Sequence, residues 1–141
     1  MIRFACAAAA ALTLCVPSAR AQDAGHTATL TFETGAATGR VMVALFDSEA
    51  AYDGNRPRAS VAVEAGAAPV VAVFRDLPAG EYAVKAFHDV DGDGEMDTNP
   101  FGIPTEPFAF SNNAVANMGP ADWARARFAV AGDVAQTLNI R

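Results

Sequence analysis

Beyond residue 21 the chain contains no cysteine, because Cys6 and Cys15 both lie near the N-terminus. This absence excludes disulfide bonds and thiol catalysis from the rest of the chain. Basic residues are also few: ten Lys and Arg against sixteen Asp and Glu give a formal charge of −6. With so little positive charge available to neutralise phosphates, we do not expect the protein to bind nucleic acid.

Long apolar runs are missing as well, apart from one at residues 4–16. Arg3 precedes this run and Ala19-Arg20-Ala21 follows it, which is the arrangement of a secretory signal peptide with a small-residue cleavage site. We therefore predict that residues 1–21 are a signal peptide and that the mature chain begins at Gln22.

The predicted location is periplasmic or extracellular, with no transmembrane segment in the mature chain, because no later run approaches the length of a membrane helix. Lipidation of Cys15 is the alternative, since residues 12–15 (Leu-Thr-Leu-Cys) resemble a lipobox. Leu14 is bulkier than the small residue usual before a lipidated cysteine, so simple cleavage is preferred.

Residues 22–141 suffice for one domain with its own core, and they consist of short β-branched segments separated by turn residues. This pattern predicts a single all-β domain, an Ig-like or transthyretin-like antiparallel β-sandwich of about seven strands, with a long loop at about 90–122. The predicted strands lie at about residues 27–33, 39–47, 60–64, 68–77, 81–89, 123–130 and 133–141.

The most distinctive stretch, FHDVDGDGEMDTNPFGIP from Phe87, places acidic side chains on alternate positions with Gly94 among them. A D-x-D-x-D-G loop curls so that its carboxylates converge on Ca²⁺, and glycine permits the sharp turn. Position 7 of such a loop supplies a backbone carbonyl, and position 9 ligates directly or through water. The predicted calcium ligands are Asp89, Asp91, Asp93, the carbonyl of Glu95, and Asp97.

The loop departs from an EF-hand at position 12, where Pro100 replaces the bidentate glutamate. No flanking helices are predicted either, so this is not an EF-hand. Asp97, Glu106 folding back, or water are the candidates for the missing ligand. The alternative interpretation is a solvated acidic loop that holds no metal.

Other segments carry a resemblance to known families. Leu77-Pro-Ala-Gly-Glu-Tyr82 is similar to the closing hairpin of transthyretin-like and carboxypeptidase-regulatory-like β-sandwiches. Together with the Asp/Gly loop, residues 39–47, 74–89, 99–104 and 110–113 resemble the bacterial exported family of unknown function numbered 2141. The resemblance implies a secreted β-sandwich without an assigned activity.

The segment that follows the stretch from Asp89 to Asp97, which we call the acidic loop, is unusually apolar. Phe101, Ile103, Phe108 and Phe110 are expected to pack over one end of the sandwich, and an exposed binding surface is the alternative. The polar residues of Ser111-Asn112-Asn113 are expected to hydrogen-bond the backbone of the long loop. Trp123 is expected to open a strand as a core residue.

The function that these observations favour is a non-enzymatic binding or accessory module of the cell envelope, acting on an unknown protein, glycan or small ligand. A small hydrolase that uses His88 with nearby carboxylates is one alternative, and a purely structural envelope component is another. No nucleophile elbow or phosphate loop is present in the sequence, and we assign no catalytic or organic-cofactor residue.

Overall fold

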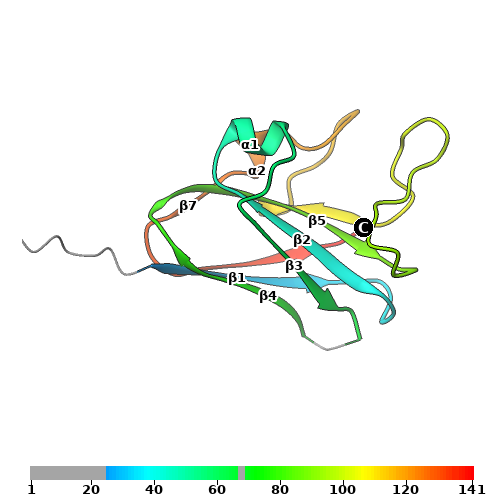
Figure 1. Ribbon diagram of the computed structural model, residues 1–141, viewed down its shortest axis with the longest axis horizontal. Coiled ribbons are helices and arrows are strands. Elements are labelled where there is room, and N and C mark those ends of the chain that lie inside the picture. The colour runs from blue at the N-terminus through cyan, green and yellow to red at the C-terminus, as the bar shows by residue number, and fades with distance from the viewer. Residues whose placement is uncertain (1–24, 67–68) are drawn as a thin grey trace, which may run out of the picture.

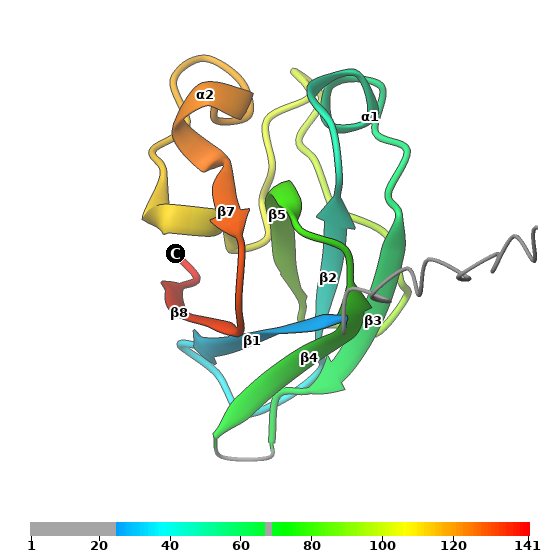
Figure 2. The same ribbon diagram turned by 90° about the vertical axis from the view of Figure 1, so that its left-hand side faces the viewer.

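The computed structural model describes residues 25–66 and 69–141 (Figure 1), so the predicted signal peptide and Gln22 lie outside the described residues. The described chain is mostly β, with eight strands in two sheets. This confirms the predicted all-β sandwich. Figure 2 shows the two sheets as separate layers, with the two short helices gathered at one end.

The smaller sheet has the order β4-β1-β8, with β4 at Val70–Leu77, β1 at His26–Glu33 and β8 at Val134–Asn139. β1 runs antiparallel to β4 but parallel to β8. The expectation of a purely antiparallel sandwich is therefore wrong for this sheet. β1 and β8 come from opposite ends of the chain, so no hairpin imposes an antiparallel pairing on them.

The larger sheet has the order β3-β2-β5-β6, and β7 also pairs with β5. Its strands are β2 (Arg40–Phe46), β3 (Ala59–Glu64), β5 (Gly80–Asp89), β6 (Phe108–Phe110) and β7 (Phe128–Val130). β2 and β5 are antiparallel, with Arg40 opposite Asp89 at one end and Phe46 opposite Ala83 at the other. The acidic loop therefore lies at one end of this strand pair and the helices at the other.

The main core lies between the two sheets and follows the alternation of the sequence. Leu30 and Phe32 of β1 are buried in it, as predicted, and so are Val41, Val43 and Leu45 of β2. Because successive side chains of a strand point to opposite faces, every second residue of β1 and β2 reaches this layer.

A second apolar cluster covers the outer face of the larger sheet under α1 (Glu49–Asp53) and α2 (Trp123–Ala126). Tyr52 of α1 is buried against Trp123, and its hydroxyl donates to the carbonyl of Ala121 at 2.8 Å. Burial, with Asp53 and Asp122 nearby, raises the pKa of Tyr52 to about 12. The core position of Trp123 is confirmed.

The predicted strand at 123–130 is wrong over its first half, because residues 123–126 form α2 and only β7 is extended. In α2 both Trp123 and Ala126 are buried, a spacing of three that fits one helical turn. Within the described part of the chain, no helix has the length and apolar character needed to cross a membrane.

The lysine of β5 ties α1 to the larger sheet. The ammonium of Lys85 donates to the carbonyl of Tyr52 at 2.7 Å and lies 4.2 Å from the centroid of the Tyr52 ring. Burial lowers the pKa of Lys85, and the charge of Asp53 opposes that shift. The ammonium therefore relies on this carbonyl and on the aromatic face for the solvation that it loses.

The predicted long loop is interrupted by β6 and by the short 3-10 helix η1 (Ser111–Asn113). β6 and β7 pair with different parts of the same edge of β5, and Ser111 fills the gap between them. Its fully buried hydroxyl accepts from the N–H of Val84 at 2.8 Å and donates to the carbonyl of Ala126.

Asn112 and Asn113 continue this connection. The side-chain amide of Asn112 donates to the carbonyls of Arg125, Ala126 and Arg127, at the C-terminal end of α2. Asn113 accepts from the N–H of Asn139 at 2.8 Å in β8. The expectation that residues 111–113 hydrogen-bond the backbone of the long loop is therefore wrong: their side chains bind the backbone of α2, β5 and β8.

Replacing Ser111 with alanine should destabilise the fold by about 2 kcal/mol, because the N–H of Val84 would lose its acceptor inside the protein. The carbonyl of Ala126 would keep a bond from Asn112. Denaturant unfolding measures the effect, and Ser60→Ala, at an exposed position of β3, is the matched control. Equal losses in the two variants would contradict this account of Ser111.

Candidate metal site

The acidic loop begins where β5 ends, at Asp89, whose side chain is completely buried. Oδ1 accepts from the N–H of Gly92 at 2.8 Å, and Oδ2 accepts from the N–H of Gly94 at 3.0 Å. Gly92 and Gly94 have φ values of +83° and +85°, in the region that glycine adopts without strain. The chain thus curls around the Asp89 carboxylate, with the predicted turn at Gly94.

The next two aspartates of the loop each bind the backbone two residues further on. Oδ1 of Asp91 accepts from the N–H of Asp93 at 3.2 Å, and Oδ1 of Asp93 accepts from the N–H of Glu95 at 2.8 Å. These are local side-chain turns of the kind that aspartate favours. They keep the loop tightly curved while the carboxylates of Asp91 and Asp93 remain exposed to solvent.

Glu106 joins the two ends of the loop from the returning chain. Its side chain is 8 % exposed; Oε1 accepts from the N–H of Val90 at 2.8 Å, and Oε2 accepts from the N–H of Asp97 at 3.2 Å. The N–H of Thr105 donates to the carbonyl of Asp97 at 2.9 Å. Glu106 is thereby fixed beside the start of the loop, although it lies far along the chain from Asp89.

Three carboxylates meet at this point. Oxygens of Asp89, Asp91 and Glu106 all lie within 4.8 Å of one another. The guanidinium of Arg40 lies 3.7 Å from Oδ2 of Asp89 and donates to the carbonyl of Gly92 at 3.0 Å. Arg40 therefore balances one of three negative charges, and a divalent cation would balance the other two.

Two of the five predicted ligands, Asp89 and Asp91, belong to this cluster. Asp93, Glu95 and Asp97 lie outside it and are exposed. Glu106, which the sequence offered only as one of three candidates for the missing ligand, supplies the third carboxylate. Glu106 lies too far along the chain from Asp89 for any motif spacing to identify it as a ligand.

The geometry does not favour the alternative in which His88 works with the neighbouring carboxylate. His88 faces the layer between the sheets and is buried, and Asp89 points to the opposite side of β5, as successive strand residues do. Nε2 of His88 lies 2.6 Å from the carbonyl oxygen of Thr38. A carbonyl only accepts, so Nε2 carries the proton and is engaged in a structural bond.

The four apolar residues that follow the loop divide into two pairs. Phe110 is buried and Phe108 is half-buried in β6, but Phe101 is 87 % exposed and Ile103 is 58 % exposed. The expectation that all four pack over one end of the sandwich is therefore wrong for Phe101 and Ile103. They lie in the turn between Thr98 and Pro104, which projects beyond the strands (Figure 1).

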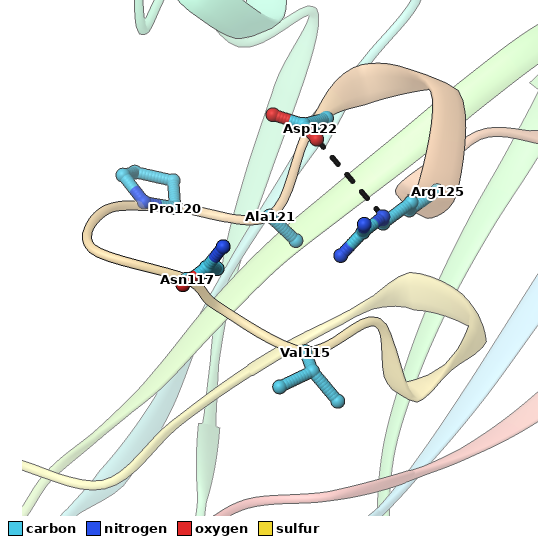
Figure 3. Close-up of a pocket in the computed structure, with 6 residues that line it drawn as sticks. All are labelled: Val115, Asn117, Pro120, Ala121, Asp122 and Arg125. Atoms are coloured by element: carbon cyan, nitrogen blue, oxygen red, sulfur yellow. Dashed lines mark ion pairs between the residues drawn. The ribbon is translucent and has the colours of Figure 1, made fainter.

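A small recess of about 100 Å³ lies at the other end of the molecule, between Val115 and Arg125. Figure 3 shows the ion pair between Asp122 and Arg125 that lines this recess. Their closest side-chain atoms are 4.0 Å apart. Sites for drug-sized ligands usually enclose about 300–1,000 Å³, so this recess suits a few waters better than an organic ligand.

A protein-family model matches residues 33–138, and its description is "Uncharacterized protein conserved in bacteria (DUF2141)". The chain belongs to this family. The match covers the larger sheet, β4 and most of β8, together with the acidic loop and Glu106, and it confirms the family resemblance of the sequence. No curated protein and no solved structure matches the chain, and the transthyretin-like resemblance stays a prediction.

Proposed function

We propose that this member of the DUF2141 family is an exported, non-enzymatic calcium-binding β-sandwich that acts as a binding or accessory module of the cell envelope. The observation that carries the proposal is the convergence of Asp89, Asp91 and Glu106 within 4.8 Å, with two of the three side chains buried. Calcium would hold the loop in the shape on which a binding surface depends.

The donor set suits a hard cation. Calcium takes six to eight oxygens, and each carboxylate oxygen has two acceptor sites. The oxygens of Asp89 and Glu106 each accept one backbone N–H, so they can ligate a cation and keep these bonds. Water molecules can complete the shell, whereas Asp93, Glu95 and Asp97 lie outside the group of three and would reach the ion only if the loop moved.

Calorimetric titration with CaCl₂ tests the proposal. We expect a dissociation constant of about 10⁻⁴ to 10⁻³ M, because three converging carboxylates without a position-12 glutamate give a site like those of extracellular modules. Asp91→Asn removes a charge and keeps an oxygen for the N–H of Asp93, whereas Glu106→Gln removes a charge and keeps an acceptor for only one of its two backbone N–H partners. Each should weaken calcium binding by roughly tenfold. Glu49→Gln, at an exposed carboxylate outside the loop, should bind as the wild type does.

Absence of calcium binding at millimolar metal would leave the loop as a solvated acidic turn closed by its own hydrogen bonds. Equal weakening by Glu49→Gln would show that the measured effect is general charge screening and not ligation. Either result would overturn the calcium part of the proposal.

Export rests on the signal peptide predicted for residues 1–21. Protein recovered from the envelope of a native host should therefore begin at Gln22 in N-terminal sequencing. An intact Met1 would contradict export with cleavage, and a lipid on Cys15 would replace simple cleavage by anchoring.

A further inference from the structure

The segment after the acidic loop forms a small hairpin, residues 98–104, whose ends pair at Thr98 and Pro104. Figure 1 shows it as a yellow-green loop that extends away from both sheets. Asn99 organises its turn: Oδ1 accepts from the N–H groups of Phe101 at 2.9 Å and Ile103 at 3.1 Å. The hairpin is thus a defined element and presents Phe101 and Ile103 outward.

Its tip is free of charge. Residues 98–105 (TNPFGIPT) contain no acidic or basic side chain, and residues 90–122 contain no Lys or Arg. The flanking Glu106 is turned inward, to the N–H groups of Val90 and Asp97. The outermost part of the molecule at this end therefore offers two large apolar side chains on an uncharged backbone.

Backbone donors at the tip are satisfied within the hairpin. The N–H groups of Asn99 and Gly102 donate to the carbonyls of Ile103 and Asn99, and the Asn99 side chain accepts from the N–H groups of Phe101 and Ile103. Pro100 and Pro104 have no N–H to satisfy. Entry into a lipid phase is costly when a backbone donor lacks a partner, whereas a protein partner can supply acceptors of its own.

We propose that this hairpin tip inserts Phe101 and Ile103 into the interfacial region of a lipid bilayer that carries anionic headgroups. A convex, uncharged tip with internally paired donors suits a bilayer better than a protein pocket. The choice of anionic headgroups rests on the proposed calcium site at the base of the hairpin. Calcium held by Asp91 and Glu106 would accept phosphate oxygens of the headgroups as further ligands. Without calcium, the anionic headgroups would repel the carboxylates of the acidic loop.

Co-sedimentation with vesicles of phosphatidylcholine and phosphatidylglycerol in equal amounts tests the proposal. The wild type should sediment with the vesicles in millimolar calcium and remain in solution in chelator. The double variant Phe101→Ser/Ile103→Ser should bind the vesicles at least roughly tenfold more weakly than the wild type. It lacks the apolar side chains that the wild type would bury in the bilayer. Its unfolding temperature and calcium titration should not change, since both side chains are exposed in the free protein.

Val115→Ser/Met118→Ser is the matched control, because these side chains are also large, apolar and exposed but lie outside the hairpin. It should bind vesicles as the wild type does. All the proteins compared carry the same N-terminal segment, so any contribution of that segment cancels. Equal binding by the hairpin variant, or binding lost equally in the control, would overturn insertion by the tip.

The two proposals fail in different ways. Calcium binding by calorimetry without vesicle binding would overturn tip insertion alone, including the case in which the tip docks on a protein. Vesicle binding in chelator that is lost in the hairpin variant would support insertion and remove calcium from it. Absence of both calcium and vesicle binding would overturn both.

Discussion

In calcium at about a hundred times its dissociation constant, the protein should be more stable to unfolding by roughly 2.7 kcal/mol than in chelator. The gain follows from linkage, because the folded chain brings together Asp89, Asp91 and Glu106 and the unfolded chain does not. Thermal or denaturant unfolding in the two buffers measures it. Asp91→Asn, whose site should be roughly tenfold weaker, should keep only about 1.4 kcal/mol of this gain at the same calcium concentration.

The metal-free protein provides the control for this result. Asp91 is exposed, and an asparagine in its place would keep an oxygen to accept from the N–H of Asp93. Asp91→Asn should therefore change stability in chelator by only about 0.5 kcal/mol or less. Removal of one repelling charge can even stabilise the metal-free loop. Identical unfolding of the wild type in calcium and in chelator would rule out a stabilising calcium site.

Much of the fold can be predicted from the sequence because strand alternation is a local signal. Leu30, Phe32 and the apolar residues of β2 reach the core through a period of two that needs no tertiary information. The stretch at Trp123 is different. Over only four residues, the spacing of apolar side chains does not distinguish a strand from one helical turn. The packing of Trp123 against Tyr52 favours the helix α2.

In the candidate site, too, the residues of a local pattern could be predicted and the residue from a distant part of the chain could not. Asp89, Asp91 and Gly94 follow a short pattern whose spacing predicts a curled loop, and the loop has that curvature. Glu106 enters through the hairpin closed at Thr98 and Pro104, a contact between residues that no local period links. The sequence does show an uncharged stretch, residues 98–105, between Asp97 and Glu106. That this stretch folds into a hairpin and returns Glu106 to the loop becomes evident only in the structure.

The position of the loop depends on a close approach between Gly39, just before β2, and the end of β5. Gly39 has a φ of +73°, and a Cβ on it would meet the carbonyl oxygen of Asp89 inside contact distance and lie 2.8 Å from Cα of Val90. Both obstacles are backbone atoms, so no side-chain rotation can relieve the clash. The sequence shows a glycine here, but the neighbour across the strand pair becomes evident only in the fold.

Gly39→Ala should therefore destabilise the protein by about 3 kcal/mol, which combines left-handed backbone strain with a forced separation of β2 from Asp89. Denaturant unfolding in chelator measures this cost without any contribution from metal. Gly35→Ala is the matched control, because a Cβ at Gly35 would have no atom within 4 Å and the residue has no positive φ; this variant should stay within about 0.5 kcal/mol of the wild type.

Since Asp89 must move to admit the new methyl group, Gly39→Ala should also weaken calcium binding, although it replaces no ligand. A Gly39→Ala protein as stable as Gly35→Ala would show that the two strands can separate at this point, and that the Asp89 carboxylate is not held by the approach of Gly39.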